Sequence, residues 1–146
     1  NKATLKIVWL YVNGDKGVIG IVIVAHGGLS REYLAAIEHV VGRQTGIIAV
    51  TIEPIHDRKK KEEEICNAAN KVDSGNGVVI VTDMFGSSPS NLSMLACEAQ
   101  NRKILYGANL PMLIKLAKCR KKGMKQAVKT ALDAGRKYID YYDGLS

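Results

Sequence analysis

Two polar side chains, His26 and Asp83, each follow an apolar run that is rich in Ile and Val. Short runs of this kind are typical of buried strands in a parallel sheet, and such sheets carry their chemistry just beyond the carboxyl ends of the strands. If the two strands are neighbours, both side chains face one crevice. A carboxylate beside an imidazole accepts one ring N–H, which fixes the tautomer and leaves the other ring nitrogen as a nucleophile.

The residues that follow His26 and Asp83 are suited to holding an anion. Gly27 and Gly28 let the backbone approach a bound group and leave amide N–H groups free to point at it. The sequence Ser87-Ser88-Pro89 predicts a helix start, with Ser88 as the N-cap and Pro89 as the first helical residue, and a helix N-terminus attracts anions. A nucleophilic histidine, an orienting aspartate and an anion cradle together predict a histidine that accepts a phosphoryl group.

Each of these residues also has an ordinary structural explanation. His26 alone is a loop residue, Asp83 is a turn residue, and Ser88 caps its helix whether or not it binds a ligand. The sequence contains neither the G-x-G-x-x-G nor the G-x-x-x-x-G-K-[ST] phosphate loop, and it lacks the G-x-S-x-G turn of serine hydrolases. The hypothesis therefore depends on the combination of residues and not on any one of them.

The remaining histidines and the cysteines give no sign of a second site. His39 lies within a predicted helix and His56 in a predicted loop, so neither is a candidate for catalysis. No pair among the three His and three Cys residues has metal-site spacing, so we expect neither a metal nor another cofactor. The three cysteines are far apart, which favours reduced thiols in a cytoplasmic protein.

The elements that position the site alternate between strands and helices, which predicts an α/β fold with a mostly parallel sheet. The predicted strands are 18–25, 47–52, 78–82 and 103–107, with an edge strand over 137–142. The predicted helices are 30–41, with Ser30 as its cap, 57–72, with Asp57 as its cap, 90–100, 112–121 and 124–134. Residues 1–16 form either an edge strand over Leu5 to Val12 or a disordered extension.

Composition sets the broad class. The chain has 146 residues, of which 47% are hydrophobic and 24% charged, which is enough for one globular domain. No apolar run approaches the roughly 20 residues that a membrane helix needs. The net charge of +7 comes largely from the last third, where the basic residues are spread over helical positions. This spread favours a solvated face over a nucleic-acid site, so we expect no nucleic-acid partner.

Three segments together resemble the mannose-type enzyme IIA family of the bacterial phosphoenolpyruvate:sugar phosphotransferase system. They are 20–27 (GIVIVAHG), 81–89 (VTDMFGSSP) and 107–112 (GANLPM), in the family's order, and the resemblance spans about residues 17–137. We therefore divide the chain into an N-terminal extension, 1–16, and a domain of this type, 17–146. The expected fold has three α/β/α layers and a four-stranded sheet in the order 2-1-3-4. The family resemblance adds an antiparallel edge strand that can be exchanged in a homodimer.

The resemblance implies a role for each site residue. His26 matches the phosphorylated histidine, Asp83 the carboxylate that hydrogen-bonds its ring, and Ser88 the serine beside the phosphoryl group; Gly27, Gly28 and Ser87 complete the expected phosphoryl-binding set. The implied donor is the phosphocarrier protein HPr, charged by enzyme I from phosphoenolpyruvate, and the implied acceptor is a IIB component that serves sugar uptake. No direct insertion into the membrane is expected.

Two other functions remain open. The same fold serves as a regulatory module when a partner protein reads its phosphorylation state and no sugar is transported. The phosphoryl-donor subunit of dihydroxyacetone kinases is also related, but there a serine is expected after the histidine. Gly27-Gly28 and the Gly86-Ser87-Ser88-Pro89 turn are more similar to the mannose type.

Overall fold

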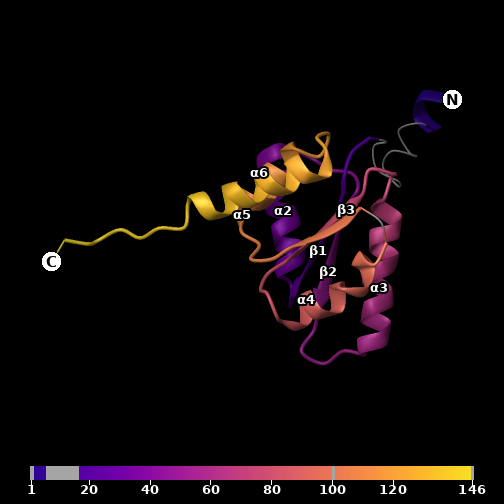
Figure 1. The fold of residues 1–146 in the computed structure, drawn as a ribbon, viewed down its shortest axis with the longest axis horizontal. Helices are drawn as coiled ribbons and strands as arrows, with labels where there is room; N and C mark the ends of the chain where they lie inside the picture. The colour runs from indigo at the N-terminus through magenta and orange to yellow at the C-terminus, as the bar shows by residue number, and fades with distance from the viewer. Residues whose placement is uncertain (1, 6–16, 100, 146) are drawn as a thin grey trace.

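The computed structural model describes residues 2–5, 17–99 and 101–145. The strands are β1 (Gly20–His26), β2 (Ile47–Ile52), β3 (Val78–Thr82) and β4 (Arg102–Leu105). The helices are α2 (Leu29–Val41), α3 (Arg58–Val72), α4 (Ser88–Ser93), α5 (Leu110–Lys118) and α6 (Met124–Lys137), with a 3-10 turn η1 (Leu95–Cys97) (Figure 1). Residues 2–5 are also helical. The predicted alternation of strands and helices is confirmed.

The four strands form one parallel sheet in the order β2-β1-β3-β4, as predicted. β1 lies in the interior of this sheet, with Ile23 opposite Ala49 of β2 on one side and Val81 of β3 on the other. The chain winds outward from β1 to β2 in one direction and from β3 to β4 in the other. The carboxyl ends of β1 and β3 therefore meet where the winding reverses, which is the usual ligand position in such sheets.

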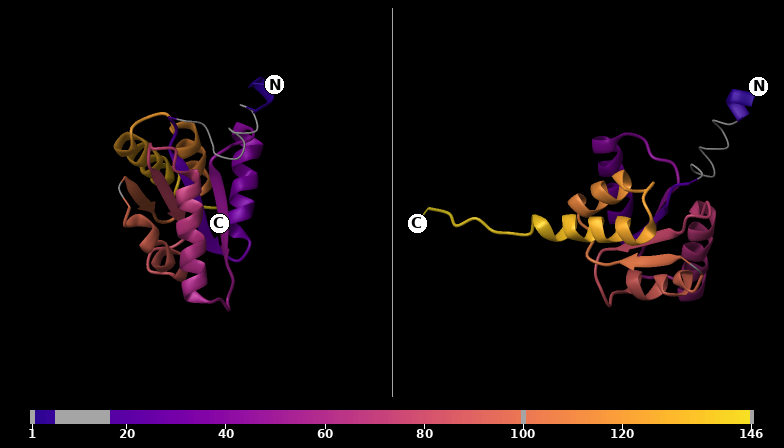
Figure 2. Two further views of the ribbon diagram at one scale, coloured as in Figure 1. Left: turned by 90° about the vertical axis from the view of Figure 1, so that its right-hand side faces the viewer. Right: turned by 45° about the horizontal axis from the view of Figure 1, so that its top comes forward.

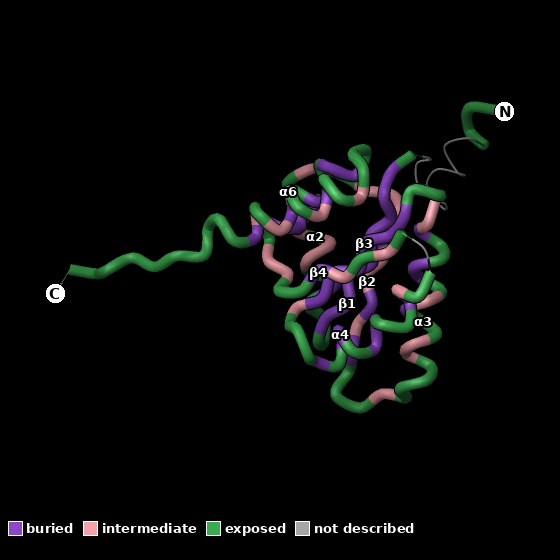
Figure 3. Tube along the Cα trace, in the orientation of Figure 1, coloured by how far each residue is buried: buried purple, intermediate pink, exposed green. Residues whose placement is uncertain are grey.

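Helices cover both faces of the sheet and give the expected three layers (Figure 2). On one face, α2, α5 and α6 pack on Ile21, Ile23, Val79 and Val81. On the other face, α3, α4 and η1 pack on the alternate strand residues, such as Val22 and Ile80. Because both faces are covered, β3 is buried throughout and the first six residues of β1 are buried, which explains their continuous apolar sequence (Figure 3).

Most helices begin and end within a few residues of the predicted positions. Asp57 caps α3 as predicted, because its side chain accepts a hydrogen bond from the Lys60 amide at 3.0 Å. α5 begins at Leu110, two residues earlier than predicted, since Asn109 caps it by accepting from the Met112 amide at 3.1 Å. α6 continues to Lys137, three residues beyond the predicted end.

Two predicted helix starts are wrong. α2 begins after Gly28 at the N-cap position, and Ser30 lies fully buried in the first turn instead of capping the helix. α4 is a short helix that begins one residue after Ser87 and ends at Ser93, so Ser88 is not the cap and the predicted helix over 90–100 does not form as one unit. The Ser93 hydroxyl donates to the Pro89 carbonyl at 2.6 Å, a local bond that competes with helix continuation.

The edge strand predicted over 137–142 is not formed within this chain. Lys137 ends α6, and residues 139–145 have no strand conformation. An edge strand needs a neighbour to pair with, but this segment leaves α6 and runs away from the sheet (Figure 1). Its apolar side chains, Ile139, Tyr141, Tyr142 and Leu145, are exposed. Residues 6–16 lie outside the described residues. They include most of the N-terminal segment for which we predicted either an edge strand or a disordered extension.

Candidate functional site

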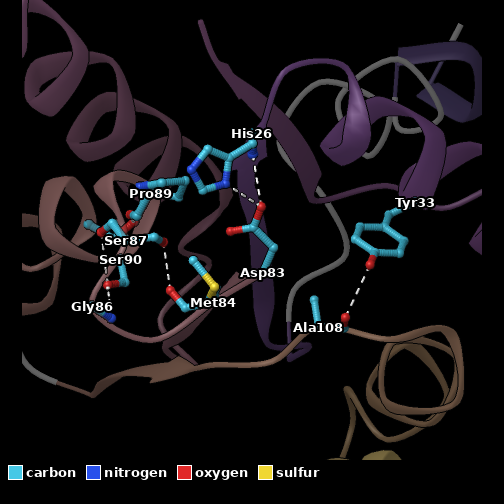
Figure 4. Close-up of polar contacts among 10 residues, drawn as sticks. His26, Tyr33, Asp83, Met84, Gly86, Ser87, Pro89, Ser90 and Ala108 are labelled. Atoms are coloured by element: carbon cyan, nitrogen blue, oxygen red, sulfur yellow. Dashed lines mark hydrogen bonds and ion pairs between the residues drawn. The ribbon is translucent and has the colours of Figure 1, made fainter. Parts of the chain in front are cut away.

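The structure brings His26 and Asp83 into direct contact at the carboxyl ends of β1 and β3 (Figure 4). His26 is the last residue of β1, and Asp83 directly follows β3. Asp83 Oδ2 lies 2.7 Å from His26 Nδ1 and accepts the His26 backbone N–H at 3.0 Å. The predicted pair is therefore present, and it depends on the β1–β3 pairing in the middle of the sheet.

The hydrogen bond selects the reactive atom of the imidazole. An ionised carboxylate only accepts hydrogen bonds, so Nδ1 carries the proton and the lone pair lies on Nε2. The His26 side chain is 53% exposed, whereas that of Asp83 is 12% exposed. The imidazole is thus half-exposed to a partner while the orienting carboxylate is mostly covered. The other carboxylate oxygen, Oδ1, is buried and has no hydrogen-bond partner among the described residues.

At Gly27 the chain leaves β1 with a backbone conformation that residues with a side chain rarely adopt. Its φ of +54° lies in the left-handed region, which glycine adopts without strain. Its amide donates to the Ile52 carbonyl at 2.9 Å, so the prediction of a free Gly27 amide is wrong. Gly28 occupies the N-cap position of α2, and its carbonyl accepts from the Glu32 amide at 3.2 Å. Gly28 is thus the glycine that directly precedes α2.

The two predicted serines face different surroundings. Ser87 is buried, and its hydroxyl donates to the Met84 carbonyl at 2.6 Å, which closes the turn before α4 (Figure 4). Ser88 is exposed and lines the same cavity as His26. The Ser90 hydroxyl accepts from the Gly86 amide at 3.0 Å and stabilises the same turn. Ser88 is therefore the serine that can contact a group on His26.

Tyr33 connects α2 to the opposite side of the site. Its hydroxyl donates to the Ala108 carbonyl at 3.1 Å (Figure 4). The Ala108 amide donates in turn to the Thr82 carbonyl at 3.0 Å. Partial burial, together with the negative charge of Asp83, raises the pKa of Tyr33 above its usual value. Tyr33 thus stays a neutral hydrogen-bond donor at physiological pH and fixes the loop beside Asp83.

Sequence reasoning missed one histidine of this region. His56, which we assigned to a loop without a site, lies in the same cavity as His26. The available signal was its position shortly after β2, because β2 is the other neighbour of β1 and its carboxyl end opens on the same edge of the sheet. His39, by contrast, lies exposed on α2, outside this cavity.

The described part of the chain contains no group of three or more His, Cys, Asp or Glu side chains arranged to hold a metal ion. Nor does any helix in that part have the length and apolar character required to span a membrane.

Over 124 residues the chain is 26% identical to the "PTS system mannose-specific EIIAB component" of Escherichia coli (strain K12). The alignment covers 83% of this chain but 38% of that protein, so the chain spans well under half of that relative's length.

Solved structures share the fold. The phosphotransferase system component EIIA from Streptococcus agalactiae superposes with a TM-score of 0.74 at 23% identity, covering 84% of this chain and 96% of that one. The mannose/sorbose specific IIA subunit from Enterococcus faecalis superposes with a TM-score of 0.74 at 19% identity, covering 88% and 98%. At these identities the likeness concerns the fold alone.

The family match extends over most of the chain. Residues 20–133 match the EIIA-man family, described as the PTS system fructose IIA component, and the matched range contains both His26 and Asp83. The resemblance noted in the sequence is thereby confirmed, and the chain belongs to the EIIA-man family of phosphotransferase system IIA components.

Proposed function

We propose that the chain is a phosphocarrier of the phosphotransferase system. His26 accepts a phosphoryl group from phospho-HPr and passes it to a IIB component that serves sugar uptake. Family membership supports a phosphotransfer role. The observation that carries the specific proposal is the bond between Asp83 Oδ2 and His26 Nδ1, because it leaves Nε2 as the exposed nucleophile.

The transfer step exchanges one N–P bond for another. The lone pair of His26 Nε2 forms the new bond to phosphorus, and the electron pair of the broken bond stays with the imidazole of the donor. The proton on Nδ1 remains in its hydrogen bond to Asp83 throughout. Most of the catalytic effect then comes from positioning and electrostatics, with Ser88 beside the phosphoryl oxygens.

Exposed apolar side chains around the site support a protein as the reaction partner. Phe85 and Met84, which follow Asp83, are 75% and 59% exposed, and Leu29, which follows Gly28, is 39% exposed. The Phe85 ring meets the Tyr106 ring edge to face, with centroids 4.9 Å apart. Exposed apolar clusters of this kind favour contact with another protein surface.

The proposal includes a homodimer and a cytoplasmic location. The outer edge of β4 pairs with no other strand of the described chain, and residues 139–145 expose apolar side chains away from the body. In the proposed homodimer, the two copies exchange their C-terminal segments, so that residues 139–145 of each chain lie against the outer edge of β4 in the other. Analytical ultracentrifugation of the full chain and of a chain that ends at Lys137 tests this part: we expect a dimer that is lost on truncation, and an unchanged assembly state contradicts it.

The decisive experiment is intact mass spectrometry after incubation with enzyme I, HPr and phosphoenolpyruvate. We expect one acid-labile phosphoryl group on the wild type and none on His26→Ala, with His39→Ala as a matched control that is labelled normally. No labelling of the wild type contradicts the proposal. Labelling without onward transfer to any IIB component favours the regulatory alternative, which neighbouring genes for a sensor kinase or an HPr kinase also favour.

A further inference from the structure

His56 and His26 line one cavity at the carboxyl edge of the sheet. The cavity has a volume of about 270 Å³ and is open on one side. Its walls come from the end of β1, the loop after β2 and the start of α4; they are His26, Gly27, Ile52, Glu53, Pro54, His56 and Ser88. A phosphoryl group on His26 Nε2 occupies the cavity that the loop after β2 also lines. His56 is the imidazole that this loop contributes to the cavity.

The hydrogen bond of His56 determines which of its nitrogens is left without a backbone partner. His56 Nδ1 lies 2.8 Å from the Glu53 carbonyl oxygen. A carbonyl only accepts hydrogen bonds, so Nδ1 carries a proton and Nε2 is the free ring atom. When the ring takes up a second proton, Nε2–H becomes a charged donor, which is the kind of group that binds a phosphoryl oxygen strongly.

The loop that carries His56 is held by a network from α3. Lys61 Nζ contacts Glu64 at 2.8 Å and Glu53 at 3.2 Å, and it donates to the Thr51 carbonyl at 3.0 Å. The Thr51 hydroxyl donates to the Glu53 carboxylate at 3.0 Å. The Lys61 side chain is 12% exposed, so this contact is largely covered. The network fixes Glu53, and with it the carbonyl that anchors His56.

The carboxylates near His56 already have partners of their own. Glu53 and Asp57 are the acidic neighbours on its own loop; Lys61 pairs with Glu53, and the Asp57 carboxylate caps α3. A hydrogen bond from its own backbone, then Lys61 and Thr51, keeps the pKa of Glu53 below its usual value. Across the cavity, Asp83 is bound to His26. Glu53 also lines this cavity, and within the described chain His56 forms no ion pair, so its ring is available to a phosphoryl group.

We propose that His56 is a second histidine of the phosphoryl site, whose Nε2 donates a hydrogen bond to an oxygen of the phosphoryl group on His26. This inference rests on the proposed function. His56 forms no covalent bond in this role. It takes one proton from solvent when the dianionic group arrives and returns it when the group leaves. The interaction stabilises phospho-His26 relative to phospho-HPr and slows its hydrolysis.

The test compares three variants with the wild type: His56→Ala, His56→Gln and His39→Ala. Each is phosphorylated by phospho-HPr and, separately, by phosphoramidate, a chemical donor that needs no partner protein. The measured quantities are the phosphoryl equilibrium with HPr, the lifetime of phospho-His26 and the ³¹P resonance as a function of pH. Circular dichroism checks that each variant is folded.

Loss of one charged hydrogen bond predicts that His56→Ala shifts the equilibrium toward phospho-HPr by about tenfold. His56→Gln keeps an N–H donor near the position of Nε2, so we expect it to recover part of this loss. In the wild type, the ³¹P resonance follows the protonation of His56, and both His56 variants lose that step. His39→Ala behaves as the wild type in every measurement.

The two proposals fail in different ways. If phospho-HPr does not label the wild type while phosphoramidate does, the proposed donor is wrong, and the lifetime and ³¹P measurements still decide the role of His56. The inference about His56 is overturned if His56→Ala keeps the wild-type lifetime and the wild-type ³¹P titration. It is also overturned if His56 itself becomes phosphorylated, because two phosphoryl groups per chain would make it an acceptor.

Discussion

One oxygen atom, Asp83 Oδ2, holds His26 at two points, the backbone N–H at 3.0 Å and the ring Nδ1 at 2.7 Å. The carboxylate therefore fixes the end of β1 and the orientation of the imidazole together. Because the donor atoms belong to one residue, a rotation of the His26 ring or a shift of the strand end disturbs the same contact. The site is thus built into the β1–β3 pairing.

Replacement of Asp83 by Asn tests this contact. The amide is neutral and presents one oxygen and one NH₂ group, so it binds the His26 ring without charge and permits the wrong tautomer. We expect phosphoryl transfer from phospho-HPr, measured by rapid quench, to slow by about 100-fold. Asp133→Asn removes a carboxylate from the exposed face of α6 and is the control. Wild-type transfer in Asp83→Asn would show that the carboxylate has no role.

The two serines before α4 have separable roles. Ser88 lines the cavity, so Ser88→Ala is expected to slow transfer by about tenfold through the loss of one hydrogen bond, without a change in thermal stability. Ser87→Ala removes the bond to the Met84 carbonyl and is expected to lower the free energy of unfolding by about 1 kcal/mol. Transfer assays and urea unfolding of both variants distinguish these effects, and the opposite pattern would exchange the two assignments.

Phe85 tests whether the partner docks on the apolar rim of the site. Its ring is 75% exposed, so Phe85→Ser removes contact area with little cost to the fold. We expect kcat/KM for phospho-HPr to fall about tenfold while the rate with phosphoramidate stays unchanged, because only the protein donor needs the surface. Val40→Ser, at an exposed position of α2, is the control. An equal loss with both donors would place Phe85 in the chemistry and not in docking.

Arg120 lies at the amino-terminal end of the strands, opposite the candidate site. Its guanidinium donates to the carbonyls of Ile19 at 2.8 Å, Thr45 at 2.6 Å and Gly46 at 3.1 Å, and the residue is buried. Arg120→Met removes this donor from all three carbonyls, of which that of Gly46 keeps the Ile21 amide at 3.0 Å, and we expect a loss of about 3 kcal/mol in the free energy of unfolding. Arg136→Met, on the exposed side of α6, serves as the matched control in urea titrations. Equal midpoints for the two variants would refute the structural role.

Cys97 gives a prediction about pH. Burial is the main cause that raises the pKa of this thiol from 9.0 to about 11. At pH 9 an unperturbed thiol is half ionised and Cys97 almost fully protonated, so alkylation of Cys97 by iodoacetamide should be about 50-fold slower in the folded chain than in urea. The unfolded thiol ionises first, so its contribution to stability is constant below pH 9 and falls between pH 9 and 11. Peptide mass mapping measures the reaction, and equal rates in both states would contradict the buried position.

The sequence alone indicated most of what is local. The continuous apolar runs around Ile23 and Val79 predicted strands covered on both faces, because only a parallel sheet between two helix layers buries every residue of a strand. The side chain of Asp57 predicted the start of α3, since a cap acts within three residues of itself. His26 and Asp83 were found for a related reason: each marks the end of such a run.

Where interactions are long-range, the sequence was less informative. The helix predicted over 90–100 does not form as one unit, because α4 ends at Ser93. The Gly27 amide, which was predicted to be free, donates to the carbonyl of Ile52 in the next strand along the chain. The strand predicted over 137–142 did not form, because within the described chain that segment has no strand beside it to pair with. Each of these outcomes depends on what a distant segment offers, and local residue types do not contain that information.

What the sequence by itself determined is the His26 and Asp83 pair at the strand ends and the class of fold that presents them. What only the tertiary structure decided is which atoms meet: the contact of Asp83 Oδ2 with both His26 donors, and the cavity that His56 shares with His26. The physical reason is that strand order and register set the neighbours of β1. A parallel sheet places the carboxyl ends of β2, β1 and β3 at the same end of the sheet, and so brings together loops that are distant in the sequence.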